Sequence, residues 1–95
     1  MWVYTTNNEM INVTIAERIE LRQETSNVAG QAVEPTAAGG MIGISIVAHF
    51  PNDQEAQLAF IAAAPNYDAV VSRYWNAIRT AIKSRAEICD LMDIL

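Results

Sequence analysis

The chain has 95 residues, of which 52% are hydrophobic and 18% are charged, and its formal net charge is -5 at pH 7. A chain of this length has room for one domain and buries roughly 60–65% of its unfolded surface, which leaves little depth for an enclosed active site. The negative charge disfavours generic binding to nucleic acid or to an anionic membrane. Because the mean hydropathy of +0.11 is high for a small globular protein, we expect some apolar surface to meet another chain.

The single cysteine, Cys89, excludes an intrachain disulfide and makes a cytoplasmic location the simpler interpretation. The N-terminus has no basic segment followed by an apolar one. The longest apolar stretches, residues 41–48 and 58–64, are far shorter than the ~20 residues of a membrane-spanning helix. We therefore expect no membrane partner.

Apolar residues alternate mainly in twos up to Ala64, which is typical of strands. Residues 2–6 and 9–13 flank Asn7-Asn8, a pair that adopts tight-turn conformations, and this pattern predicts a first hairpin. Over residues 13–22 the apolar and charged side chains occupy opposite parities, so a strand with one buried and one solvated face is expected. The apolar residues at odd-numbered positions are Val13, Ile15, Ile19 and Leu21, and the charged residues at even-numbered positions are Arg18, Glu20 and Arg22.

Residues 25–40 are rich in small and polar residues and include Pro35 and Gly39-Gly40, so we expect a mobile loop there. Residues 41–50 predict a central strand, with Ile42, Ile44, Ile46, Ala48 and Phe50 on one face. Pro51-Asn52-Asp53 predicts a turn, and residues 56–62 predict a final strand whose apolar face holds Ala56, Leu58, Phe60 and Ala62. Two hairpins would form one four-stranded antiparallel sheet.

From Tyr67 onward the apolar residues recur every three or four positions, which predicts one long helix. A continuous helix would extend to residue 93, but the apolar stripe moves to another side past Arg85, so continuity beyond that residue is left open. Asn66 is a suitable N-cap, and Asp68 in the first turn suits the helix dipole. The helical stripe that we expect to cover the sheet contains Val71, Tyr74, Trp75, Ile78 and Ile82. The predicted fold is therefore α+β, a four-stranded antiparallel sheet covered on one face by a long C-terminal helix, with a curled, barrel-like sheet as the alternative.

The opening Met1-Trp2-Val3-Tyr4-Thr5, with the following turn and Met10-Ile11-Asn12-Val13, resembles short uncharacterised bacterial proteins that begin Met-Trp-(Ile/Val)-x-Thr. The resemblance implies a small antiparallel sheet with a C-terminal helix. It implies no activity and no site residues.

No residue cluster forms a catalytic, cofactor-binding or metal-binding signature, so we predict no catalytic residue, no cofactor and no metal. His49, the only histidine, is the one weak functional candidate. Its parity is opposite to the expected core face, and a general base would need an oriented partner that the sequence does not identify. Cys89 lies on the apolar helical stripe, where a small buried side chain is expected rather than a nucleophile.

The end of the expected helix carries basic residues before acidic ones. Antiparallel pairing with a second copy, crossing near Ala86, would oppose the two charges and cover the apolar residues of the last turns. We therefore predict a homodimer, although another protein partner would fit the same surface. The predicted interface consists of Arg79, Lys83, Arg85, Ala86, Glu87, Ile88, Asp90, Leu91 and Leu95.

These observations favour a small non-enzymatic interaction or structural module that self-associates through its C-terminal helix. The first alternative is a ligand-binding or catalytic domain with a pocket at a subunit interface, formed by His49 and helix residues such as Arg85. The second alternative is a nucleic-acid-binding module that uses the basic residues of the helix beside Tyr74 and Trp75. The overall acidity makes nucleic acid the less favoured partner.

Overall fold

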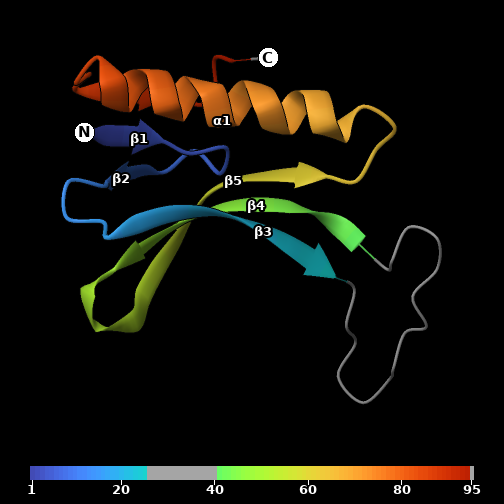
Figure 1. Ribbon diagram of the computed structural model, residues 1–95, viewed down its shortest axis with the longest axis horizontal. Helices are drawn as coiled ribbons and strands as arrows, with labels where there is room; N and C mark the ends of the chain where they lie inside the picture. The colour runs from blue at the N-terminus through green and yellow to red at the C-terminus, as the bar shows by residue number, and fades with distance from the viewer. Residues whose placement is uncertain (26–40, 95) are drawn as a thin grey trace.

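The structure, a computed structural model, describes residues 1–25 and 41–94. One long α-helix lies along one side of a set of short and long strands (Figure 1). In chain order the elements are β1 (Trp2–Tyr4), β2 (Met10–Asn12), β3 (Arg18–Thr25), β4 (Met41–Phe50), the 3-10 turn η1 (Pro51–Asp53), β5 (Gln54–Ala62), α1 (Tyr67–Lys83) and β6 (Ile88–Asp90). The expected loop over residues 25–40 lies outside the described residues, except for Thr25, which ends β3.

The class is α+β with antiparallel strands and one helix near the C-terminus, as predicted, but the single four-stranded sheet is wrong. The described strands form two three-stranded sheets, ordered β2-β1-β6 and β3-β4-β5. The β1–β2 hairpin forms a separate sheet because the end of the chain supplies a third strand, β6, which pairs in parallel with β1. The two sheets meet where the Thr6 N–H donates to the Leu58 carbonyl at 3.1 Å.

The β3-β4-β5 sheet follows the predicted faces of β4 only in part, because Ile42 is 48% exposed while Ser45 and Val47, on the opposite parity, are buried. It also departs from the prediction in β5. Ile46 and Ala48 are fully buried on the face of β4 toward the helix. The β4–β5 register shifts between Ile46 and Val47 of β4, which leaves Leu58 of β5 as an extra residue without an opposite partner. Such a bulge changes the parity of the strand. As a result Leu58 and Ala59 are both fully buried, and Ala62, expected on the apolar face, is exposed.

The hydrophobic core lies between the two sheets and α1. It joins Val3 of β1, Ile46 of β4, Leu58 of β5 and Ile78 of α1 into one cluster. The helix contacts β4, β5 and β6. Burial of this kind stabilises the fold by about 25 cal/mol for each Å² of apolar surface removed from water.

Helix α1 begins at Tyr67 as predicted, although the Asn66 side chain makes no capping hydrogen bond. The helix does not continue to residue 93. The Ala86 N–H donates to the Ala81 carbonyl at 2.9 Å and the Arg85 N–H to the Ile82 carbonyl at 3.2 Å. Arg85 has a φ of 54°. This is a Schellman motif, in which a left-handed residue ends the helix and satisfies its last carbonyl groups.

The chain after this motif turns back and lies beside β1. The Trp2 N–H donates to the Glu87 carbonyl at 2.8 Å, and the Leu91 N–H donates to the Tyr4 carbonyl at 3.0 Å. Cys89 and Leu91 are therefore buried in the core rather than placed on a helix. Within the described residues, α1 is not long and apolar enough to cross a membrane.

Candidate functional site

An open groove lies between α1 and the segment that connects β2 to β3. Its volume is about 630 Å³. The apolar lining comes from Ile19 at the start of β3 and from Trp75 and Ile82 of the helix, while Arg18 and Arg85 also line it. Ile82 is 54% exposed even though it belongs to the stripe expected to cover the sheet. The stripe is therefore only partly covered by the chain's own strands.

A second, smaller cavity of about 530 Å³ is lined by β3 and the first turns of α1. Leu21 of β3 and Val71 of α1 contribute apolar surface to it, and Leu21 is 44% exposed. The two cavities together leave a partly apolar side of the molecule open between β3 and α1. We call this side, formed by Ile19, Leu21, Val71, Trp75 and Ile82, the open side.

Four charged or titratable side chains gather on the opposite face of the β3-β4-β5 sheet. Arg22 donates to both carboxylate oxygens of Glu55, at 2.9 and 2.8 Å, and to Glu20 at 2.9 Å. His49 Nε2 is hydrogen-bonded to Glu20 Oε1, and His49 Nδ1 lies 3.5 Å from Glu55 Oε2. We call Glu20, Arg22, His49 and Glu55 the charged cluster.

The charged cluster shifts the pKa of its carboxylates in one direction. Hydrogen bonds from His49 and then Arg22 hold the pKa of Glu20 below its ordinary value of 4.5. The hydrogen bonds from Arg22 lower the pKa of Glu55 in the same way, and both carboxylates raise the pKa of the Arg22 guanidinium. All these shifts favour the ionised forms, because each carboxylate has a cationic neighbour.

The parity of His49 in the sequence predicted its face correctly but did not identify its partners. The signal was present in the alternation of Arg18, Glu20 and Arg22, because antiparallel pairing of β3 with β4 brings that parity beside His49. A hydroxyl on this face, that of Ser45, is buried and accepts a hydrogen bond from Gln57 at 2.8 Å. In the described part of the chain the charged cluster thus has ionic partners but no nucleophile bonded to His49.

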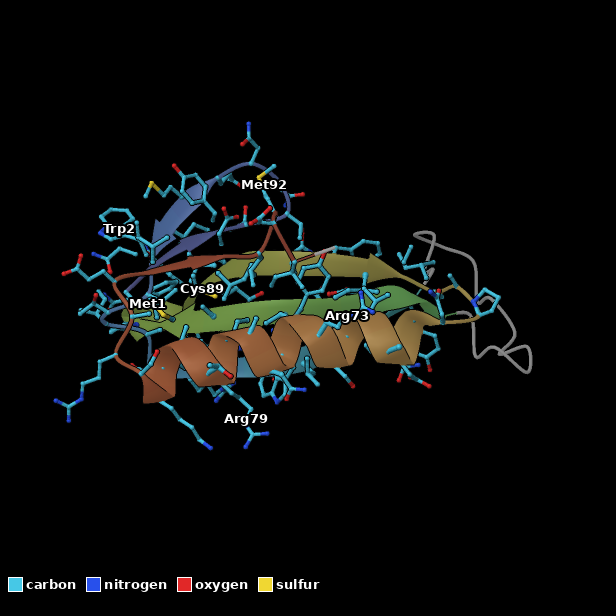
Figure 2. All side chains as sticks on the ribbon, turned by 90° about the horizontal axis from the view of Figure 1, so that it is seen from above. Met1, Trp2, Arg73, Arg79, Cys89 and Met92 are labelled. Atoms are coloured by element: carbon cyan, nitrogen blue, oxygen red, sulfur yellow. The ribbon has the colours of Figure 1, made fainter. Side chains whose placement is uncertain are left out.

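The predicted interface residues do not lie on one helix face. Arg79 and Lys83 are exposed on α1 and Arg85 is exposed beyond its end, with Arg79 projecting away from the sheets (Figure 2). Ile88 and Asp90 are exposed in β6, whereas Leu91 is fully buried and cannot contact a partner. Ala86 is half-buried, Glu87 is exposed in the turn before β6, and Leu95 lies outside the described residues. A helix crossing centred on Ala86 is therefore wrong, because α1 has already ended there.

His49 and Arg85 do not converge on one cleft. Arg85 lines the groove beside α1, and His49 lies in the charged cluster on the other face of β4.

Tyr74 is only 5% exposed, so its ring is not available to stack on a nucleic acid base. Burial, and then the charge of Asp90, raise the pKa of the Cys89 thiol, which makes it a poor nucleophile. Among the described residues no group of three side chains is arranged to hold a metal ion.

The outer face of the β2-β1-β6 sheet carries a second apolar surface. Trp2 and Ile88 are opposite one another in the register, as are Tyr4 and Met10. Their exposed fractions lie between 36% for Tyr4 and 53% for Ile88. Figure 2 places Trp2 on the side of the molecule away from α1, so this surface is separate from the open side.

No family model matches the chain, and neither the curated proteins nor the solved structures contain a match to it.

Proposed function

We propose that this chain is a small non-enzymatic interaction module that self-associates along the open side. The observation that carries the proposal is Ile82, a large apolar residue that is 54% exposed next to an apolar groove. Exposed apolar surface of this kind, bordered by polar residues, is typical of an interaction site. The proposal keeps the helix as the associating element but moves the contact from the chain end to the side of α1 that borders β3.

Ile82 and Ile88 provide a matched pair for the test, because they are 54% and 53% exposed and lie on different surfaces. Burying the exposed half of an isoleucine side chain is worth about 1 kcal/mol. A symmetric dimer buries the residue twice, so Ile82→Gln should weaken self-association by about 2 kcal/mol, or roughly thirty-fold in Kd. Ile88→Gln should leave the Kd unchanged.

The measurement is sedimentation equilibrium of the wild type and both variants over a protein concentration series. Circular dichroism confirms that each variant is folded. A wild type that remains monomeric at the highest concentration contradicts the proposal. A Kd that responds to Ile88→Gln and not to Ile82→Gln would instead assign association to the outer face of the β2-β1-β6 sheet.

A second candidate function is binding of a small apolar ligand that carries an anionic group. The groove volume of about 630 Å³ lies within the range of ligand pockets, and Arg18, Arg79 and Arg85 line it. A fatty acid has the required chemistry. Isothermal titration with a medium-chain fatty acid tests this candidate, and an Arg79→Gln/Arg85→Gln variant should lose the heat of binding.

A further inference from the structure

The outer edge of β3 is free within the described part of the chain. β3 is the first strand of the β3-β4-β5 sheet and pairs only with β4. It contains eight residues, and the outer edge of such a strand presents unpaired N–H and C=O groups on which another strand can form. The proposed function leaves open which element of a second copy meets the open side, and the free edge of β3 gives an answer.

The hydrogen-bonding pattern shows which backbone groups face this edge. The Ala63 N–H donates to the Ile42 carbonyl at 2.9 Å, in register with the β4–β5 pairing. Even-numbered residues of β4 therefore direct their backbone groups toward β5, and odd-numbered ones toward β3. The odd residues of β4 are opposite even residues of β3, such as Glu20 opposite Val47. It follows that Ile19, Leu21 and Gln23 direct their N–H and C=O groups to the free edge.

The side chains of β3 match a second copy of the same strand. On the face that carries the charged cluster, β3 reads Arg18, Glu20, Arg22 and Glu24, with charges of alternating sign. When two copies run antiparallel and Leu21 is opposite Leu21, each Arg18 is opposite a Glu24 and each Glu20 is opposite an Arg22. Opposite charges at facing positions stabilise a strand pair by about 0.2–1 kcal/mol each.

The charges also exclude the neighbouring registers. Sliding one strand by two residues centres the pair on Glu20 or on Arg22. The first shift places Arg18 opposite Arg22 and Glu20 opposite Glu20, and the second places Glu20 opposite Glu24 and Arg22 opposite Arg22. Like charges at facing positions are destabilising. Sliding by one residue would place Leu21 opposite a charged residue and reverse the faces.

We infer that two copies of the chain join through antiparallel β3 edges centred on Leu21, which continues the β3-β4-β5 sheet across a two-fold axis. This inference rests on the proposed function and names the contact. In the joined sheet both α1 helices lie on the same face, one on each side of the axis. Leu21, which is 44% exposed in one chain, then contacts its copy below the space between the helices. Val71 lines the cavity at Leu21, and Trp75 and Ile82 line the neighbouring groove at Ile19.

Disulfide trapping tests the register. Cys89 is the only native thiol, so Cys89→Ala provides a background without free thiols. In that background Leu21→Cys should form a disulfide-linked dimer under mild oxidation, because facing Cα atoms lie about 5.5 Å apart, within the range of a disulfide. Gln23→Cys alone should not, since the two copies of residue 23 are offset by about 13 Å along the strand. A mixture of Ile19→Cys and Gln23→Cys chains should form the mixed dimer, which keeps Leu21 intact.

A charge exchange provides an independent readout in the chain without added cysteines. Arg18→Glu and Glu24→Arg should each weaken self-association about ten-fold, because each creates two facing pairs of like charge. An equimolar mixture of the two variants should restore the wild-type affinity. A dimer that gives no Leu21 disulfide, no mixed disulfide and no restored affinity overturns this inference and leaves self-association standing. A monomeric wild type overturns both, and restored affinity with the mixed disulfide supports both.

Discussion

Truncating Leu91 separates a core role for the C-terminal segment from a role in binding. Leu91 is fully buried, and its N–H holds the segment against Tyr4 of β1. Replacing a buried leucine by alanine removes its apolar contacts and leaves a cavity, at a cost of about 2–5 kcal/mol. Because Leu91 is close to the chain end, where the surroundings relax more easily, we expect Leu91→Ala to reduce the free energy of unfolding by about 2–3 kcal/mol.

The assay is urea unfolding followed by circular dichroism, at two protein concentrations so that association is separated from folding. A loss of this size corresponds to a fall of about 10–20 °C in the Tm of a domain of this length. Ile88→Ala, three residues earlier in β6 and 53% exposed, is the control and should cost less than about 1 kcal/mol. If Leu91→Ala is as stable as the wild type but self-associates more weakly, the reasoning is refuted, because Leu91 would then act at an interface.

Three other substitutions or conditions test separate parts of the structure. Gly43→Ala should destabilise the chain by about 1–3 kcal/mol in urea unfolding, because the new Cβ would lie 2.5 Å from Phe60 Cζ, and an unchanged midpoint would contradict this contact. Thr5→Val should cost about 1–2 kcal/mol, since the Thr5 hydroxyl accepts the N–H groups of residues 7 and 9, and Thr5→Ser should retain most of the stability. Because the pKa values of Glu20 and Glu55 are lowered in the folded state, their contribution to stability is present above pH 4.5 and is lost as the pH falls below it. Urea midpoints at pH 6 and pH 3 should therefore differ less in Glu20→Gln/Glu55→Gln than in the wild type.

The sequence predicted the elements whose local pattern agrees with their final environment. β4 coincides with the predicted residues 41–50, and Ile46 and Ala48 of its expected apolar face are fully buried. The first hairpin also formed as expected, with Asn8 at a φ of 62° in the turn. In both cases the alternation of side chains or the turn residues mark the element locally, and a single sequence records these signals.

The elements that were missed depend on contacts between distant residues or on unusual backbone conformations. The end of α1 was missed because the left-handed position is occupied by Arg85, whereas glycine is the usual signal there. The short strand β6 has no pattern of its own and forms because β1 accepts it as a parallel neighbour. The bulge at Leu58 similarly follows from the pairing of β5 with β4.

The candidate site was predictable in part for the same reason. The parity of His49 gave its face, and the apolar stripe gave the side of α1 that packs toward the strands, where Tyr74 and Ile78 are buried. The partners of His49 required the register between β3 and β4, which a single sequence does not specify. Leu91 was assigned to the interface because the helical periodicity was extended past the end of the helix. The helix ends at Lys83, so this periodicity does not apply to Leu91.

Hydrogen exchange of the β3 amides tests most directly the claim that two copies pair through their β3 edges. The even-numbered amides, which face β4, serve as the control for the odd-numbered amides, which face the free edge. The amides of Glu20 and Arg22 bond to β4 and should be protected at every protein concentration. The account predicts that the amides of Ile19, Leu21 and Gln23 become protected only as the concentration rises through the Kd of self-association. Rapid exchange of these three amides at concentrations where the chain is fully associated would contradict it.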